Sequence, residues 1–191
     1  MAVGASIRTR ARTYLRRAWA RHAPRSFALL GAPSRAELGA VGEELAARQL
    51  RRAGFKLLGR RLATPHAEVD LWARRDGESW VIEVKTGHCA RLGRDGWDLR
   101  WRPGLSLDQA QRMRLARATA YLARAPSEDL GTPRGRQSRG RLALVEVLVC
   151  SRTGVLEVLA PVEMDAKLAG TRSSIPGHPG HRGASFRTGL G

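Results

Sequence analysis

The dipeptide Asp76-Gly77 is the sequence feature that most constrains the fold, because it lies midway between two segments in which apolar and polar residues alternate. Both central positions of a type I′ turn need positive φ, and Asp-Gly in such a setting strongly favours a two-residue hairpin. The turn fixes the register of the two predicted strands. We therefore expect Leu71 to face Ile82 on an apolar face of the hairpin.

The same register predicts a charged face, on which Asp70 lies opposite Glu83 and Glu68 lies opposite Lys85. Opposed residues in an antiparallel pair have Cβ atoms roughly 4.5–5.5 Å apart, where like charges destabilise the pair. The repulsion is offset if one carboxyl is protonated or if a cation lies between the two, and oxygen ligands on rigid strands suit Mg²⁺. The alternative is a solvated strand face with an ordinary ion pair between Glu68 and Lys85.

Lys85 is unusual in a chain that has 34 basic residues but only three lysines, the others being Lys56 and Lys167. Arginine therefore serves almost everywhere that positive charge alone is needed. An ammonium group is a compact charge whose pKa falls when it is desolvated, so it can orient or deprotonate a water molecule, which a guanidinium cannot do. A hydrolytic metal site would use such a group.

Positive charge is concentrated at the two ends of the chain, whose net charge is +17. Residues 1–36 hold eight arginines and residues 166–191 hold four basic residues, and neither segment contains an acid. This distribution predicts a polyanionic partner, bound through phosphate contacts that weaken with salt. The alternative is a general bias of the composition toward arginine.

Composition also predicts the domain boundaries. We expect a basic extension over residues 1–33, partly helical or disordered, one domain over 34–165, and a disordered basic Gly/Pro-rich tail over 166–191. Residues 5–21 have the pattern of a basic amphipathic helix, which is typical of a nucleic-acid-binding arm, a segment upstream of the true start, or an organellar transit peptide.

Two cysteines, Cys89 and Cys150, show neither metal-ligand spacing nor a secretory context, so we expect reduced thiols. The sequence contains no apolar run long enough to cross a membrane. We therefore expect a cytoplasmic protein with no membrane partner.

Helix signals predict two helices in the domain. Ser34 begins a helix over 34–52, and Glu37 completes its capping box. A second helix is expected over 108–124, with Gln111 in the reciprocal capping position.

Strand signals occur over 55–62, 68–73, 79–86 and 142–150, with an extra C-terminal strand over 155–160. The order is α-β-β-β-α-β followed by that extra strand. The predicted class is α/β, with a central sheet flanked by helices.

The intervening segment 87–106 is expected to be irregular and to interleave tryptophan with arginine. Aromatic rings beside arginines can stack on bases and bind phosphates, although such a loop can also pack its tryptophans against the domain. The candidate nucleic-acid contacts, which include the start of the second helix, are Arg91, Arg94, Trp97, Arg100, Trp101, Arg102, Arg112 and Arg114.

Several ordered blocks resemble the YraN-like, endonuclease-related family of the PD-(D/E)xK superfamily. They are GAVGE at 39–43, EVDL at 68–71, EVK at 83–85, and Tyr121-Leu122 near the end of the second helix. The resemblance covers roughly residues 38–149 and implies a bacterial protein with a restriction-endonuclease-like core, a mixed central sheet and similarity to Holliday junction resolvases. Bacterial membership argues against a transit peptide.

Carried over residue by residue, the resemblance implies that Asp70 and Glu83 coordinate Mg²⁺ or Mn²⁺ with help from the Val84 carbonyl. Lys85 would position the attacking water, and Glu43 from the first helix would reach the same site. The implied chemistry is in-line attack on a phosphodiester. Glu68 matches the motif, but is expected to be a supporting ion-pair partner.

Four positions depart from the family pattern. Ala67 replaces a glycine, Arg61 an asparagine, Gln111 a lysine and Ala143 an aspartate. These departures leave the implied catalytic set intact and affect the expected substrate contacts.

The expected function is that of a Mg²⁺-dependent, resolvase-like nuclease acting on DNA. The alternatives are a non-catalytic nucleic-acid-binding protein that retains the fold, or a basic protein associated with RNA or ribosomes. DNA is expected ahead of RNA as the partner, and a dimer is compatible with the sequence.

Overall fold

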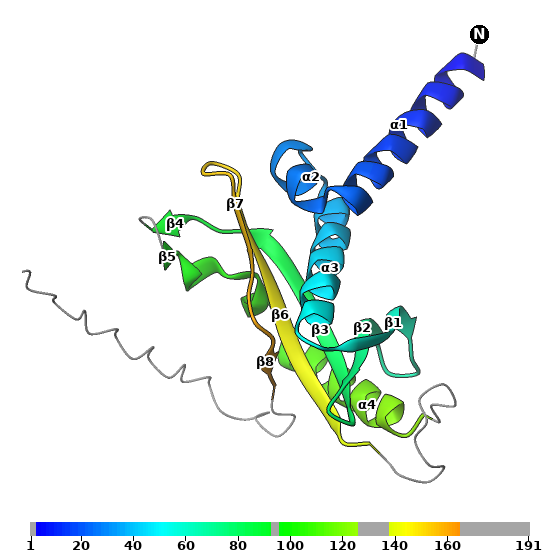
Figure 1. The fold of residues 1–191 in the computed structure, drawn as a ribbon, viewed down its shortest axis with the longest axis vertical. Helices are drawn as coiled ribbons and strands as arrows, with labels where there is room; N and C mark the ends of the chain where they lie inside the picture. Colours follow the sequence, from blue (N-terminus) through cyan, green and yellow to red (C-terminus); the bar gives the residue numbers. More distant parts are fainter. Residues whose placement is uncertain (1–2, 93–95, 126–137, 165–191) are drawn as a thin grey trace, which may run out of the picture.

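The computed structural model describes residues 3–92, 96–125 and 138–164, with the side chains of residues 12–16 and of those from 18 onward (Figure 1). The predicted tail over 166–191 lies outside the described residues. Its helices are α1 Val3–His22, α2 Pro24–Leu30, α3 Arg35–Arg52 and α4 Gln109–Ala123, with the 3-10 turns η1 Leu99–Trp101 and η2 Pro103–Ser106. Its strands are β1 Lys56–Ala63, β2 Glu68–Arg75, β3 Glu78–His88, β4 Arg91–Leu92, β5 Gly96–Trp97, β6 Gly140–Cys150, β7 Val155–Val158 and β8 Val162–Glu163.

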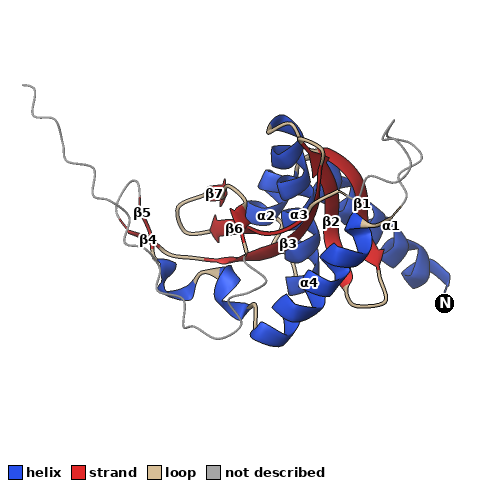
Figure 2. Cartoon of the chain, turned by 90° about the horizontal axis from the view of Figure 1, so that it is seen from below, coloured by secondary structure: helices blue, strands red, loops and turns tan. Residues whose placement is uncertain are grey.

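The central sheet is mixed and has the order β1-β2-β3-β6-β7, with the short strand β8 paired to β6. Strands β3 and β6 run parallel, whereas the other pairs in this sheet are antiparallel. Helices α3 and α4 flank the sheet (Figure 2). The predicted α/β class, the mixed sheet and the restriction-endonuclease-like arrangement are confirmed.

The predicted hairpin forms with the predicted turn and register. Asp76 has φ 53° and Gly77 has φ 79°, so both central positions of the turn lie in the left-handed region. Leu71 pairs with Ile82, as expected. The register from the turn to this pair is therefore confirmed.

Helix α3 begins with the predicted capping box, in which Ser34 and Glu37 satisfy each other's backbone N–H groups. Its apolar stripe, including Val41 and Leu45, packs on one face of the sheet against Ile82. The opposite face belongs to a second core, in which α4 residues such as Leu115 pack on Val81 and Leu142. Neighbouring residues of β3 thus face different cores, as strand alternation requires.

The alternation of side chains between the two faces of the sheet fails where β2 pairs with β1 near Asp70. Arg61 on β1 has φ 46° and lies between the last regular pairs that β1 makes with β2, opposite Asp70. Val69 packs into the α4 core, although simple alternation would place it with Leu71 in the α3 core. The predicted alternation is therefore wrong for β2 residues that precede Asp70, because β1 and β2 both depart from regular strand geometry at Arg61 and Asp70.

The two N-terminal helices lie against α3, and α1 projects away from the sheet (Figure 1). Phe27 and Ala28 of α2 are fully buried in the α3 core. Arg16 of α1 forms a bidentate pair with Glu37, at 2.8 and 3.0 Å. The packed domain therefore includes α2, which precedes the boundary expected at residue 34.

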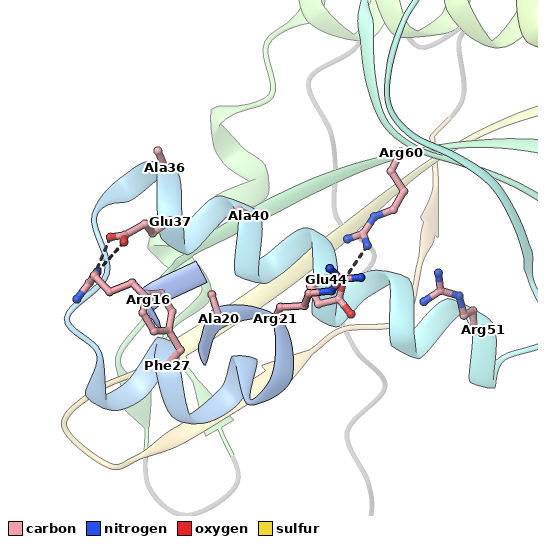
Figure 3. A pocket seen from close by; sticks show the side chains of 10 residues that line it. All are labelled: Arg16, Ala20, Arg21, Phe27, Ala36, Glu37, Ala40, Glu44, Arg51 and Arg60. Atoms are coloured by element: carbon pink, nitrogen blue, oxygen red, sulfur yellow. Dashed lines mark hydrogen bonds and ion pairs between the residues drawn. The ribbon is translucent and has the colours of Figure 1, made fainter. Parts of the chain in front are cut away.

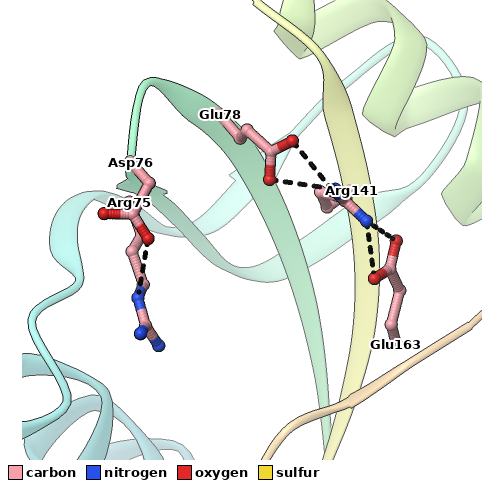
Figure 4. Close-up of polar contacts among 5 residues, drawn as sticks. All are labelled: Arg75, Asp76, Glu78, Arg141 and Glu163. Carbon is pink, nitrogen blue, oxygen red and sulfur yellow. Dashed lines mark hydrogen bonds and ion pairs between the residues drawn. The ribbon is translucent and has the colours of Figure 1, made fainter.

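Charged groups near the hairpin turn are joined in pairs (Figure 4). Arg141 on β6 binds Glu78 of β3 through two bonds of 2.9 Å, and it also binds Glu163 of β8 at 2.6 Å. Arg75 contacts Asp76 at 3.2 Å. These pairs connect three strands at this end of the sheet.

Cys89 and Cys150 are free and buried, as expected. Within the described part of the chain, the helices include none that is both long and apolar enough to span a membrane.

Candidate active site

The candidate site lies where β2 separates from β3. The hydrogen-bonded ladder between them ends at the pair Leu71 and Ile82, and Asp70 is the next residue along β2. Its carboxylate Oδ2 accepts a hydrogen bond of 2.7 Å from the Val84 backbone N–H. The Asp70 side chain therefore occupies the position on β3 that a continuing strand would take.

Asp70 lies in an environment that disfavours its charge. Burial, followed by the charge of Glu83, raises the pKa of Asp70 to about 6, against the opposing effects of the Val84 N–H and of Lys85. Repulsion between the two carboxylates was the consequence of the predicted register. The structure supports that prediction, although the two residues lie just beyond the regular ladder.

Glu83, Lys85 and Gln111 form a contact triangle under the first turn of α4. The Lys85 Nζ lies 2.8 Å from Glu83 Oε1, and the Gln111 side-chain amide donates to the same oxygen at 2.8 Å. Lys85 also reaches the Gln111 oxygen at 3.5 Å. Glu83 is almost fully buried, so these two donors are its main compensation.

Gln111 was expected to complete a capping box, and this expectation is wrong for its side chain. Asp108 does cap α4 by accepting from the Gln111 backbone N–H at 2.6 Å. The Gln111 side chain instead points into the site and contacts Glu83. The sequence signal that could have revealed this role is the departure from lysine at this position.

Glu43 approaches the site from α3, on the other side of the sheet from α4. Burial, and then the charge of Asp70, raise the pKa of Glu43, whereas Arg61 and Arg60 act in the opposite direction. Glu43 therefore lies near enough to Asp70 for the charge of Asp70 to affect its pKa. That the two carboxylates act in one site stays a prediction.

A glycine explains how α3 comes so close. A Cβ atom at Gly42 would overlap the Thr86 hydroxyl, so only glycine allows the helix to lie against β3 at this height. Gly39, the other glycine of the same block, has nothing within 4 Å of such an atom. Gly42 therefore positions the helix that carries the neighbouring Glu43.

Glu68 does not pair with Lys85. Its carboxylate lies 3.4 Å from the Arg61 guanidinium, and both side chains are well exposed. The expected pair between Glu68 and Lys85 is therefore wrong, since Glu68 pairs with Arg61 on β1 and Lys85 is bound to Glu83.

Comparison with known proteins identifies the family. A model described as "Uncharacterised protein family UPF0102" matches residues 42–149, which include all four implied catalytic positions. The chain belongs to the UPF0102 family.

Individual relatives agree with this assignment. A UPF0102 protein of Roseiflexus castenholzii is 41% identical over 93 residues, which cover 47% of this chain and 66% of that protein. The UPF0102 protein STH1475 of Symbiobacterium thermophilum is 36% identical over 92 residues, covering 48% and 71%. A Syntrophomonas wolfei relative is 46% identical over 57 residues, covering 30% of this chain and 50% of that protein. The chain thus spans half of the Syntrophomonas wolfei protein and about two thirds of the Roseiflexus castenholzii protein.

The residues of this UPF0102 site can be tested against the needs of a divalent cation. Among residues 3–92, 96–125 and 138–164, no three or more His, Cys, Asp or Glu side chains are grouped so that they could hold a metal ion. Asp70 and Glu83 nevertheless offer hard oxygen donors, and burial together with the nearby charge of Glu83 raises the pKa of Asp70. The Val84 carbonyl faces the same side of β3 as its N–H, toward Asp70. This donor set suits Mg²⁺, which retains several water ligands.

Four of the eight predicted nucleic-acid contacts of this UPF0102 protein have partners within the chain. Trp97 donates to Glu157 at 2.6 Å and lies under Arg91, whose guanidinium is 5.1 Å from the ring. Arg100 is paired with Asp98 at 2.8 Å. Trp97 is therefore held beside β7 by its indole N–H, and its stacking role stays a prediction.

The remaining candidates divide into three groups. Trp101 is 79% exposed, and Arg112 and Arg114 are exposed on α4, so these three are accessible. Arg102 is bound to the buried Glu146. Arg94 lies outside the described residues.

Glu146 is a residue that sequence reasoning missed. It is 2% exposed, lies beside Lys85 in the parallel ladder, and accepts from the Arg102 side chain and from the Gly104 N–H. These bonds hold the 3-10 turns that lead into α4. No local signal reveals the role, because a glutamate in an apolar strand forms no motif with residues so far away in the chain.

A cavity of about 550 Å³ lies on the outer side of α3, between that helix, α1, α2 and β1 (Figure 3). Its two carboxylates are compensated, since Glu37 is paired with Arg16 and Glu44 with Arg60. Glu44 faces this cavity, whereas its neighbour Glu43 faces the site, as expected for residues about 100° apart on a helix. The cavity is therefore separate from the candidate site.

Proposed function

We propose that this protein is a metal-dependent nuclease that hydrolyses phosphodiester bonds in DNA. The observation that carries the proposal is the meeting of Asp70 and Glu83 beside Lys85, at a place where burial and the charge of Glu83 raise the pKa of Asp70. A perturbed carboxyl beside a second carboxylate and a lysine is typical of a catalytic site. Membership of a family related to restriction endonucleases supports the same function.

The residues that would hold Mg²⁺ or Mn²⁺ are Asp70, Glu83 and the Val84 carbonyl. A divalent ion held there supplies charge stabilisation for an in-line displacement and makes a bound water more acidic. Asp70 is suited to this role, because a bound cation would stabilise its charged form, which burial and the charge of Glu83 disfavour.

The other residues have distinct tasks in the proposed reaction. Lys85 lies 2.8 Å from Glu83, and its ammonium group can orient the attacking water. Gln111 fixes Glu83 and Lys85 relative to each other. Glu43 adds a carboxylate from α3 that can accept a proton from that water.

The test compares the wild-type chain with Asp70→Ala on flapped, branched and single-stranded DNA in Mg²⁺ and in Mn²⁺. We expect cleavage by the wild type, loss of cleavage in the variant and retained DNA binding by anisotropy. Calorimetry should show that the wild type binds the metal ion and that Asp70→Ala binds it more weakly. Absence of both cleavage and metal binding in the wild type would contradict the proposal.

A second candidate function is non-catalytic nucleic-acid binding. The observation that favours it is the closed contact between Glu83, Lys85 and Gln111, which already compensates Glu83 without a metal ion. It predicts that wild type and Asp70→Ala bind DNA equally and that neither cleaves it. A salt-titrated competition between DNA and RNA of the same sequence tests whether the bound partner is instead RNA.

A further inference from the structure

A second cavity, of about 570 Å³, lies between the C-terminal half of α4 and the loop that joins β1 to β2. We call it the α4 cavity. Its lining contains three basic side chains, one tyrosine and no carboxylate: His66, Arg117, Ala120, Tyr121, Arg124 and Ala125. It differs in this respect from the cavity beside α1, whose lining includes two glutamates.

Both arginines of the α4 cavity lack an acidic partner among the residues that the structure describes. Arg117 and Arg124 are exposed, and neither guanidinium forms an ion pair with those residues. Elsewhere in the domain, arginines such as Arg102 and Arg141 are bound to glutamates. The α4 cavity therefore presents positive charge that is available to an anion.

The cavity also has an aromatic wall. Tyr121 is 49% exposed, and its ring meets His66 edge to face, with centroids 6.2 Å apart. The contact holds Tyr121 from one side, where the hairpin bends toward α4, and leaves part of its ring accessible. An accessible ring beside two unpaired guanidinium groups is the combination that binds single-stranded nucleic acid, through base stacking and phosphate contacts.

The α4 cavity is connected to the candidate active site by one helix. Arg114, Arg117, Tyr121 and Arg124 share a flank of α4, because they are spaced by three or four residues. Gln111 in the first turn of the same helix contacts Glu83. Ten residues of helix separate Gln111 from Tyr121, or about 15 Å. With one phosphate per 3.4 Å in a stacked strand, that distance corresponds to about four or five nucleotides.

We propose that the α4 cavity is a binding subsite for an unpaired DNA strand, with a base on Tyr121 and phosphates on Arg117 and Arg124. The strand then follows the flank of α4 past Arg114 to Asp70 and Glu83. This continuation rests on the proposed nuclease function, whereas binding in the α4 cavity does not require cleavage.

The experiment measures binding of a fluorescein-labelled 12-nucleotide oligodeoxythymidylate by anisotropy, in EDTA and across a salt series. The full chain carries Asp70→Ala throughout, so that cleavage cannot occur. The test variants are Arg117→Ala with Arg124→Ala, and Tyr121→Leu. The matched control is Arg51→Ala with Arg52→Ala, which removes two exposed arginines from the last turn of α3. Circular dichroism and thermal melting of each variant verify that it is folded.

The double arginine variant should reduce the slope of log K against log salt by about 1.4, the value for two phosphate contacts on a single strand. Tyr121→Leu should weaken binding roughly five- to a hundredfold without changing that slope. Tyr121→Leu should affect binding of a blunt duplex less strongly, since duplex bases cannot stack on Tyr121.

Four outcomes would overturn the subsite. They are equal weakening by the α4 and α3 double variants, unchanged affinity in Tyr121→Leu, an equal effect of Tyr121→Leu on duplex and single strand, or tighter binding of a 12-nucleotide oligouridylate than of the oligodeoxythymidylate. Failure of the nuclease proposal is read separately, from cleavage assays on the chain with Asp70 intact. A chain that binds through the α4 cavity and does not cleave retains the subsite and loses the nuclease.

Discussion

The two ends of the β2–β3 hairpin carry similar numbers of charged groups, but they treat these charges in opposite ways. At the turn, Arg141 joins Glu78 to Glu163 across three strands. At the open end, burial and then the charge of Glu83 raise the pKa of Asp70 to about 6. The charges at the turn are paired across strands, whereas at the open end Lys85 and Gln111 compensate Glu83 and leave Asp70 with a raised pKa that a bound cation would lower.

The largest expected effect comes from removing the charge of Asp70 while keeping its shape. Asp70→Asn retains an oxygen that can accept from the Val84 N–H, so the fold is preserved. Cleavage should fall by about 10²-fold or more, since a lost supporting contact at a metal site already costs 10–100-fold. Steady-state cleavage assays measure the loss.

Stability should change in the other direction. A carboxyl whose pKa is raised in the folded state destabilises that state when the pH is high enough to ionise it. At pH 8 in EDTA, the unfolding free energy of Asp70→Asn should therefore exceed that of the wild type by about 1–3 kcal/mol. Urea unfolding measures this gain. A variant that loses both activity and stability would show that Asp70 is structural, and the contrast between the two ends would disappear.

Gln111→Ala should lower cleavage by roughly 10–100-fold, because Glu83 and Lys85 would lose their shared partner. Gln111→Lys restores the family's usual residue and should recover part of the activity. The comparison uses single-turnover assays at saturating DNA. Equal activity in Gln111→Ala and the wild type would refute the positioning role.

Gly42→Ala should destabilise the fold by about 1–3 kcal/mol, since its methyl group would overlap the Thr86 hydroxyl. Gly39→Ala is the matched control in the same helix, where the methyl group meets nothing within 4 Å. This control should stabilise the protein by about 0.5–1 kcal/mol. Chemical denaturation measures the unfolding free energy of both variants. Changes of the same sign in the two variants would contradict the close approach of α3.

At the turn end, Glu78→Gln should lower the melting temperature and leave cleavage unchanged, because it removes one carboxylate from Arg141 far from Asp70. Differential scanning calorimetry and the cleavage assay provide the two readouts. A loss of activity that exceeded the loss of folded protein would show that the two ends are coupled.

The smallest expected effect concerns acid. The Arg16 guanidinium, with the Ser34 N–H, lowers the pKa of Glu37 to about 2 from its ordinary 4.5. This stabilisation is complete above pH 4.5 and is lost as the pH falls toward 2. Glu37→Gln should therefore show a flatter dependence of unfolding free energy on pH across that window. An unchanged profile would mean that the exposed pair contributes nothing measurable.

The sequence was sufficient to predict the hairpin, because the Asp76-Gly77 turn is local and fixes the opposed pairs as far as Leu71 and Ile82. The prediction failed at Val69, since the change of course at Arg61 and Asp70 depends on packing against α4. A periodic pattern contains no information about where a strand bends under such tertiary contacts.

Other features depended on contacts between distant parts of the chain. Gln111 satisfied a local capping rule and was assigned to it, while its side chain bonds to Glu83. The roles of Trp97 and Arg102 were decided by partners on β7 and β6. Each partner becomes adjacent only when the sheet is assembled, so spacing along the sequence could not predict it.

The parallel pairing of β3 with β6 has a consequence for how the molecule is assembled. The β2–β3 hairpin closes through a two-residue turn, whereas β6 joins β3 only after the chain has passed through α4. Local contacts form early in folding and long-range parallel pairs form late. We therefore expect the two carboxylates to meet before Gln111 and Glu146 arrive, at a stage when Lys85 of the same strand relieves their repulsion without Gln111. Divalent cations should then accelerate the folding of this protein as well as its proposed reaction.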